Sequence, residues 1–89
     1  MAMTGGDAQA LFGFAAELRN RRRNIEKSAT RLGALVQNAH WVGPDRDRFV
    51  SEWSERHAPA LMGVCGDLDT AAQNVTSHAQ AQENVSRGG

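Results

Sequence analysis

The stretch His40-Trp41-Val42-Gly43-Pro44-Asp45 lies near the middle of the 89-residue chain, between two long helical patterns. Glycine adopts backbone conformations that are closed to other residues, so Gly43 suits a tight turn. Pro44 suits the first position of a helix, where its missing N–H has no helical partner. Asp45 then falls in the first turn, where a carboxylate meets the positive end of the helix dipole. The segment therefore predicts a turn over residues 40–44 that joins two helices.

Before this turn, apolar residues recur every seven positions, which is typical of a helix that packs along one stripe. One row reads Leu11, Leu18, Ile25, Leu32 and Ala39, and a second reads Phe14, Arg21, Ser28 and Leu35. Asp7 suits the N-cap position after the Gly5-Gly6 pair. The pattern predicts a helix over residues 7–39, and we expect residues 1–6 to be flexible.

After the turn, the same spacing returns in two neighbouring rows. They read Val50, His57, Val64, Ala71, His78 and Val85, and then Leu61, Leu68 and Val75. The rows predict a helix over residues 45–86 that is kinked or broken near Pro59, because proline lacks a backbone donor and its ring crowds the preceding turn. One helical hairpin would thus occupy residues 7–87, followed by a flexible tail at 88–89.

The apolar stripes are wider than one facing helix can cover, so we expect a second hairpin to bury the remainder. Trp41 offers a large flat surface that would cover the open end of the hairpin. The predicted fold is all-α: an antiparallel two-helix hairpin that pairs into a four-helix bundle dimer. The residues expected to form the hairpin core and the partner interface are Leu11, Phe14, Leu18, Ile25, Leu32, Leu35, Phe49, Trp53, Leu61, Val64, Leu68 and Val75.

Composition argues against catalysis and metal binding. A single cysteine, Cys65, leaves no internal disulfide, zinc finger or paired-cysteine redox site. His57 and His78 lie about 31 Å apart along one helix and cannot share a metal ion within one chain. The chain has no glycine-rich phosphate loop, and it is too short to build a catalytic cleft. We expect no enzymatic activity, no cofactor and no metal. No stretch reaches the about 18 apolar residues that a membrane span needs, and no Sec-type signal peptide is visible.

Charge is balanced overall but divided along the chain. Ten basic and ten acidic residues cancel, which disfavours a general nucleic-acid binder. Residues 1–40 carry six basic and three acidic groups, whereas residues 41–89 carry four basic and seven acidic groups. The basic cluster from Arg19 to Arg31 fits a solvated helix face, an acidic partner, an anionic membrane or nucleic acid. Within it, Arg21 occupies an apolar row and predicts an ion pair that selects the partner.

Trp41-Val42-Gly43 at the midpoint of a short chain, followed by Pro44-Asp45 and then by Phe49 and Trp53, resembles the WXG family. These proteins are the early secretory antigenic target-like substrates of type VII secretion in actinobacteria and firmicutes. The resemblance covers about residues 7–86. It implies a turn built on Trp41, Gly43 and Pro44, and pairing with a second copy or a paralogous hairpin. It also implies export by the type VII machinery without a cleaved signal peptide.

The chain departs from the family in one respect. Members, or one member of each pair, usually carry a Tyr-x-x-x-Asp/Glu export signal after the second helix, and this sequence has no tyrosine. A partner could supply the signal, or a related system could read another one. The alternative is a cytoplasmic, chaperone-like adaptor for a larger secreted effector. A third reading is a nucleic-acid-binding hairpin that uses the Arg19–Arg31 face.

Overall fold

The structure, a computed structural model, describes the backbone of residues 5–88 and the side chains of residues 7–85. It contains α1 (Gly5–Asn38), α2 (Pro44–Glu52), the π-helical turn η1 (Trp53–His57) and α3 (Ala58–Gly88). No strand occurs within residues 5–88, so the predicted all-α class is confirmed. Residues 1–4 and 89, which belong to the two ends expected to be flexible, lie outside the described part of the chain. Gly5, Gly6 and Gly88 from the same expected ends lie within α1 and α3, and Asp7 lies in the first turn of α1 and not at its N-cap.

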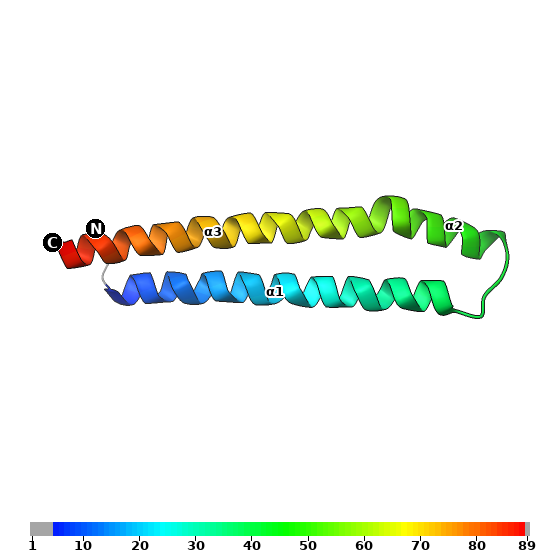
Figure 1. Cartoon of the computed structure of the whole chain (residues 1–89), viewed down its shortest axis with the longest axis horizontal. Helices are drawn as coiled ribbons and strands as arrows, with labels where there is room; N and C mark the ends of the chain where they lie inside the picture. Colours follow the sequence, from blue (N-terminus) through cyan, green and yellow to red (C-terminus); the bar gives the residue numbers. More distant parts are fainter. Residues whose placement is uncertain (1–4, 89) are drawn as a thin grey trace.

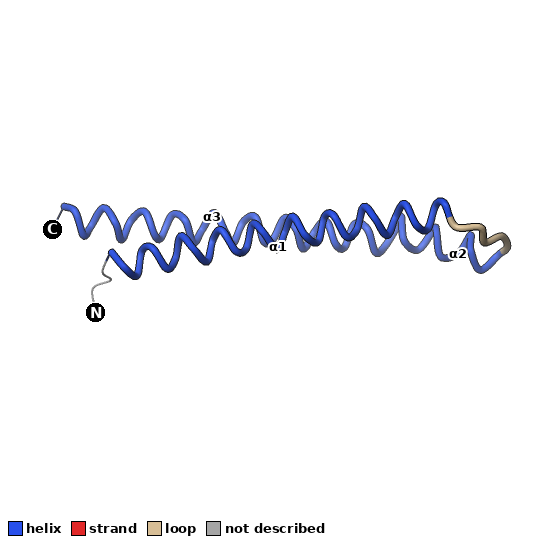
Figure 2. Tube along the Cα trace, turned by 90° about the horizontal axis from the view of Figure 1, so that it is seen from below, coloured by secondary structure: helices blue, strands red, loops and turns tan. Residues whose placement is uncertain are grey.

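α1 and α3 lie side by side along their length and run in opposite directions (Figure 1). The chain measures 67 × 17 × 16 Å, so it is a rod with the bend at one end and the start of α1 and the end of α3 at the other. Seen at 90° to that view, the two long helices cross over each other (Figure 2). A rod only two helices thick has no interior comparable with that of a globular domain, and its side chains are buried in a single row.

That buried row consists of small side chains. On α1 it contains Ala8 and Ala15, and on α3 it contains Cys65, Ala72 and Ala79, all at most 2% exposed. Consecutive members of the row are seven residues apart, which places them on one side of each helix. Small side chains let the two helix axes approach closely, since the residues at the contact set the interaxial distance. We call this row the seam; Arg22, Ala29, Val36 and Ala58 continue it at the same spacing and are half-buried.

The irregularity expected at Pro59 takes the form of a π turn, and the helix does not break. The N–H of Ala58 donates to the carbonyl of Trp53, five residues earlier, which is the bond that defines the turn. Pro59 follows directly and would have crowded the carbonyl of Glu55 in a regular α-helix. The wider turn also aligns Trp53 with Ala58, so the tryptophan joins the seam and is only 8% exposed.

The bend uses the residues that follow Trp41. Gly43 has φ 130° and ψ 178°, a backbone conformation that residues other than glycine rarely adopt. Pro44 is the first residue of α2, and the N–H of Asp47 donates to the carbonyl of Gly43 at 3.1 Å. Trp41 and Phe49 lie against each other with ring centroids 6.3 Å apart. The bend is therefore held by one glycine conformation, one proline and one aromatic pair.

Candidate protein-interaction surface

The apolar rows expected from the sequence lie beside the seam, on one face of the helix pair. Each member follows a seam residue by three positions, as Leu11 follows Ala8 and Leu68 follows Cys65. Because the two helices run in opposite directions, residues at this spacing face the same side of the helix pair from α1 and from α3. Ile25 of α1 and Leu61 of α3 accordingly line one shared hollow. We call this surface the apolar face; its members are Leu11, Leu18, Ile25, Leu32, Leu61, Leu68 and Val75, with Phe14, Leu35 and Val64 at its outer edges.

Much of the apolar face is open to solvent. The inner members Leu11, Leu18 and Ile25, and their counterparts Leu61, Leu68 and Val75, are half-buried. The outer members are more open: the exposed fraction is 53% for Phe14, 68% for Leu35 and 44% for Val64. Exposed apolar side chains that gather in a contiguous patch are typical of a protein–protein interaction site. Packing of α1 against α3 thus covers the inner members of the apolar face in part and leaves the outer members in solvent.

The opposite face of the pair is mostly polar, although it also contains half-buried Phe12 and exposed Met62. Arg19 of α1 donates to the hydroxyl of Thr76 of α3 at 3.3 Å, and Arg22 lies 3.3 Å from a carboxylate oxygen of Asp69. Both α3 residues follow a seam residue by four positions, which places them on the side away from the apolar face. We call this the polar face. The two faces differ in chemistry, because interhelical polar contacts occur on the polar face, whereas most of the large apolar side chains lie on the apolar face.

Arg22 occupies a seam position where its neighbours along the row are alanines. Its guanidinium leaves the seam toward the polar face and pairs with Glu26 at 2.7 Å and with Asp69 at 3.3 Å. The Nε atom is buried and makes no hydrogen bond, so its approach to Asp69 is an ion pair without hydrogen-bond alignment. This residue is the one charged side chain of the seam within the described part of the chain. Its contacts connect α1 to α3 in one register.

Arg21, which is predicted from the sequence to select the partner, lies on the apolar face. It pairs with Glu17 at 2.8 Å, one helical turn earlier, and its side chain is 69% exposed. The pair is therefore not buried within this chain. Arg21 also lines the hollow shared by Ile25 and Leu61, so a partner that covers the apolar face would meet this ion pair.

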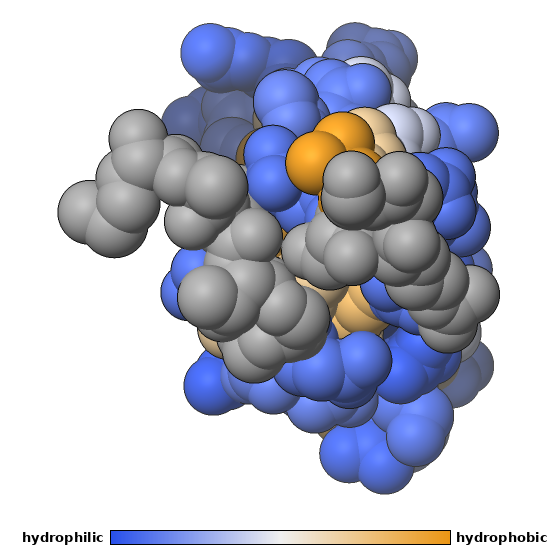
Figure 3. All heavy atoms as spheres, turned by 90° about the vertical axis from the view of Figure 1, so that its left-hand side faces the viewer, coloured by the Kyte–Doolittle hydropathy of each residue, from blue (hydrophilic) through white to orange (hydrophobic). Residues whose placement is uncertain are grey.

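The bend carries a second exposed apolar area. Trp41 is 47% exposed and Phe49 is 40% exposed, while Val42 is almost fully exposed. Trp41 therefore lies against Phe49 but leaves half of its surface in solvent. Trp53 differs from both, since its indole lies in the seam beside Gly33. The view along the rod from the opposite end shows mostly hydrophilic side chains among the described atoms, with a small hydrophobic patch (Figure 3).

The side chains considered for chemistry are scattered. His57 and His78 are exposed and lie three heptads apart, and the thiol of buried Cys65 lies 3.7 Å from the backbone carbonyl of Arg22. Within the described residues, no group of three or more histidine, cysteine, aspartate or glutamate side chains could hold a metal ion. No helix in the same part of the chain has the length and apolar character to cross a bilayer.

Comparisons with known proteins find no matching family model, no matching curated protein and no matching solved structure. The candidate site therefore depends on the residues and their geometry.

One feature of the site was missed by sequence reasoning, namely the seam itself. The signal was present, because alanines recur at Ala8, Ala15 and Ala29, and again at Ala58, Ala72 and Ala79 with Cys65 between them. Leucine and phenylalanine rows next to them suggested the helix contact, since large apolar residues are the ones most expected to be buried. The larger side chains instead occupy the flank of the contact.

Proposed function

We propose that this chain is a non-enzymatic helical hairpin of the WXG type that acts by pairing through its apolar face. Its partner is a second copy or a paralogous hairpin, and the product is a four-helix bundle. By resemblance to type VII secretion substrates, the pair is exported together without a cleaved signal peptide.

One observation carries the proposal: the predicted heptad rows lie together on one uncovered face. Leu35 and Phe14 are more than half exposed at one edge of that face, and Val64 is 44% exposed at the other. Covering a large apolar side chain is worth about 1.5–3 kcal/mol, so several of them together favour association. Another helix pair offers two parallel ridges of matching length, which a compact globular partner does not. The bend with Trp41, Gly43 and Pro44 supports the family resemblance.

A second candidate is the adaptor that remains in the cytoplasm with a larger effector. The observation in its favour is the lack of tyrosine, so the Tyr-x-x-x-Asp/Glu signal of the family does not occur in this sequence. In this case the apolar face would cover a helical segment of the effector. The same surface thus serves both candidates, and they differ in the fate of the protein.

The decisive measurement is the mass of the species formed in solution. The purified chain, alone and after co-expression with products of neighbouring genes, would be examined by sedimentation equilibrium. A homodimer, or a one-to-one complex with a similar small protein, is the expected result. A stable folded monomer at micromolar concentration in both cases would contradict pairing.

Immunoblotting separates export from retention. Detection in culture filtrate, lost when the secretion machinery is deleted, is expected for a type VII substrate. Retention in the cell together with an exported effector would favour the adaptor. For partner choice, Arg21→Leu is the informative variant: an unchanged preference between two candidate hairpins would remove the role predicted for Arg21.

A further inference from the structure

Three cations on the outer side of α1 have no anionic partner in the part of the chain that the structure describes. Arg23, Lys27 and Arg31 make no ion pair or hydrogen bond within the described residues, whereas Arg19 and Arg21 each have one partner and Arg22 has two. The three follow one another at intervals of four residues, so they form a line about 12 Å long on the helix surface. We call this line the basic stripe.

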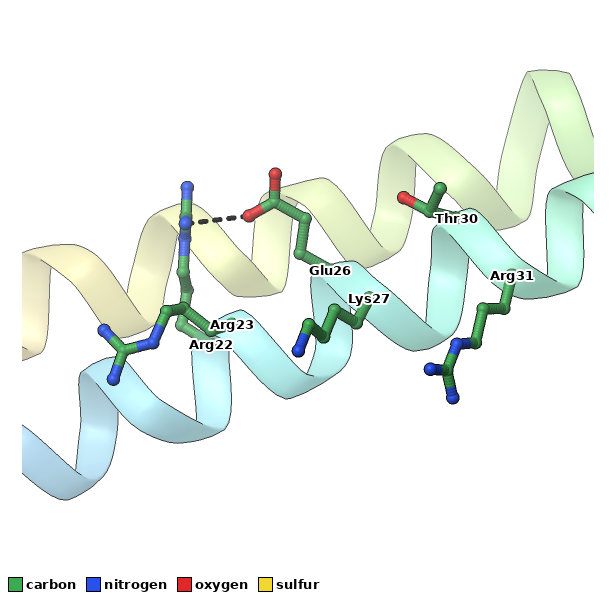
Figure 4. A pocket seen from close by; sticks show the side chains of 6 residues that line it. All are labelled: Arg22, Arg23, Glu26, Lys27, Thr30 and Arg31. Carbon is green, nitrogen blue, oxygen red and sulfur yellow. Dashed lines mark ion pairs between the residues drawn. The ribbon is translucent and has the colours of Figure 1, made fainter.

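The basic stripe points away from the rest of the molecule. Figure 4 shows the side chains of Arg23, Lys27 and Arg31 extending to the side opposite α3, while Arg22 and Glu26 extend toward α3. The stripe is also separate from the apolar face. Leu18 and Ile25 of that face follow a seam residue by three positions, and no residue of the stripe does. A partner bound to the apolar face would therefore leave the stripe accessible.

Like charges four residues apart repel one another weakly along a helix. The nearby carboxylate of Glu26 is paired with Arg22, so the three cations leave a local positive potential that the balanced net charge of the chain conceals. An anionic ligand would gain this attraction, and it would also relieve the repulsion within the stripe. The stripe is thus a surface whose charge is left uncompensated by the fold.

The surroundings of the stripe favour a protein segment as the ligand. The three cations line an open hollow of about 490 Å³ together with Thr30, a hydrogen-bonding group, and with Arg22 and Glu26, which pair with each other at 2.7 Å. Next to Arg31 a second, largely apolar hollow is lined by Ala34 and Leu35. The basic stripe ends next to this apolar hollow. An acidic helix with one apolar side chain at its end would therefore match both the charge of the stripe and the apolar hollow.

Nucleic acid and membranes match this surface less well. The stripe covers about 12 Å of a rod 67 Å long, which gives a long polyanion few contacts. No aromatic side chain stands among Arg23, Lys27 and Arg31 for base stacking. The chain also has no net positive charge to draw it toward an extended anionic surface.

We propose that the basic stripe docks an acidic helical segment of another protein, whose carboxylates repeat every four residues. Carboxylates at that spacing have the same rise per step as the stripe, so three of them meet Arg23, Lys27 and Arg31 in turn. An apolar residue beyond the last carboxylate enters the hollow at Ala34. The three cations lie outside the apolar face, and the hollow at Ala34 shares only Leu35 with its outer edge, so the site adds a second partner to the protein.

The test uses a labelled, helix-stabilised peptide with three glutamates four residues apart, followed by a leucine. A second peptide of identical composition distributes the glutamates around the helix. Binding to the full chain is measured by fluorescence anisotropy at physiological salt. The variant Arg23→Gln/Arg31→Gln removes two cations of the stripe, and Arg48→Gln/Arg56→Gln removes the same charge from exposed positions of α2 and η1. Circular dichroism records the helix content of both variants.

We expect the aligned peptide to bind, and the stripe variant to bind it about tenfold more weakly, since exposed ion pairs are individually modest. The control variant should stay within about twofold of the unchanged chain. Equal affinity for both peptides, or an equal loss of affinity for the aligned peptide in the two variants, would overturn the proposal. Either result would show nonspecific charge attraction. Tighter binding to a short DNA duplex or to phosphatidylserine-containing vesicles than to the aligned peptide would also overturn it. The peptide comparison needs no variant, so the proposal remains testable if a variant unfolds.

Discussion

A Cβ atom on Gly33 would lie 3.2 Å from Nε1 of the Trp53 indole. That separation is tighter than ordinary van der Waals contact, so the missing side chain at position 33 is what lets the indole lie against α1. The π turn directs Trp53 into the seam, and Gly33 receives it. The two features depend on each other, although they are 20 residues apart in the sequence.

Substitution at Gly33 should reveal this contact. Glycine to alanine inside a helix ordinarily stabilises by about 1 kcal/mol. For Gly33→Ala we expect a smaller gain than for Gly66→Ala, because the Trp53 indole must shift to admit the methyl group, whereas a Cβ at Gly66 meets nothing within 4 Å. Gly33→Val should lower stability. Thermal unfolding followed by circular dichroism, at one fixed protein concentration, measures all three.

Equal gains for Gly33→Ala and Gly66→Ala would show that the indole does not lie against position 33. The comparison isolates the contact, because both sites are helical and both changes add the same methyl group.

Gly43→Ala should destabilise the bend. With φ 130° and ψ 178°, position 43 has a backbone conformation that costs other residues about 1–3 kcal/mol. We expect the free energy of unfolding in urea to fall by an amount of this order. The matched control is Gly13→Ala in α1, where a Cβ meets nothing within 4 Å and the same change should raise stability.

The seam makes a prediction about side-chain volume. Ala72 is fully buried between the two long helices. Ala72→Leu must therefore push the helices apart or force the leucine side chain out of its preferred rotamers. We expect a loss of about 1–3 kcal/mol in the free energy of unfolding. Ala16→Leu places the same side chain at an exposed site of α1 and should leave stability nearly unchanged. Equal stability of the two variants would contradict the close approach of α1 and α3 at Ala72.

The apolar face makes a prediction about association. Leu35→Glu and Phe14→Glu place a charge on exposed positions of that face, so the helix pair itself should tolerate them. In a bundle these charges would be buried, and we expect the dissociation constant to rise about tenfold or more. Sedimentation equilibrium measures the change. Val42→Glu, at the nearly fully exposed tip of the bend, is the control and should not alter association.

The sequence by itself determined the helical class and the position of the bend. Seven-residue spacing is a local property of the chain, and the physics of proline and glycine acts on their immediate neighbours, so Gly43 and Pro44 could be read directly. The exposure of Phe14 and Leu35 was also foreseeable in part, since the apolar stripes exceed the width of one helix contact.

Only the tertiary structure decided which heptad row forms the contact and which lies beside it. Ala8, Ala15 and Ala72 are adjacent in the repeat to Leu11, Leu18 and Val75, and a rotation of each helix by less than a turn would exchange their roles. Periodicity identifies a stripe but does not fix that rotation. It depends on how closely two backbones can approach, on the π turn before Pro59 and on the charge of Arg22, and these effects act only once both helices are in place.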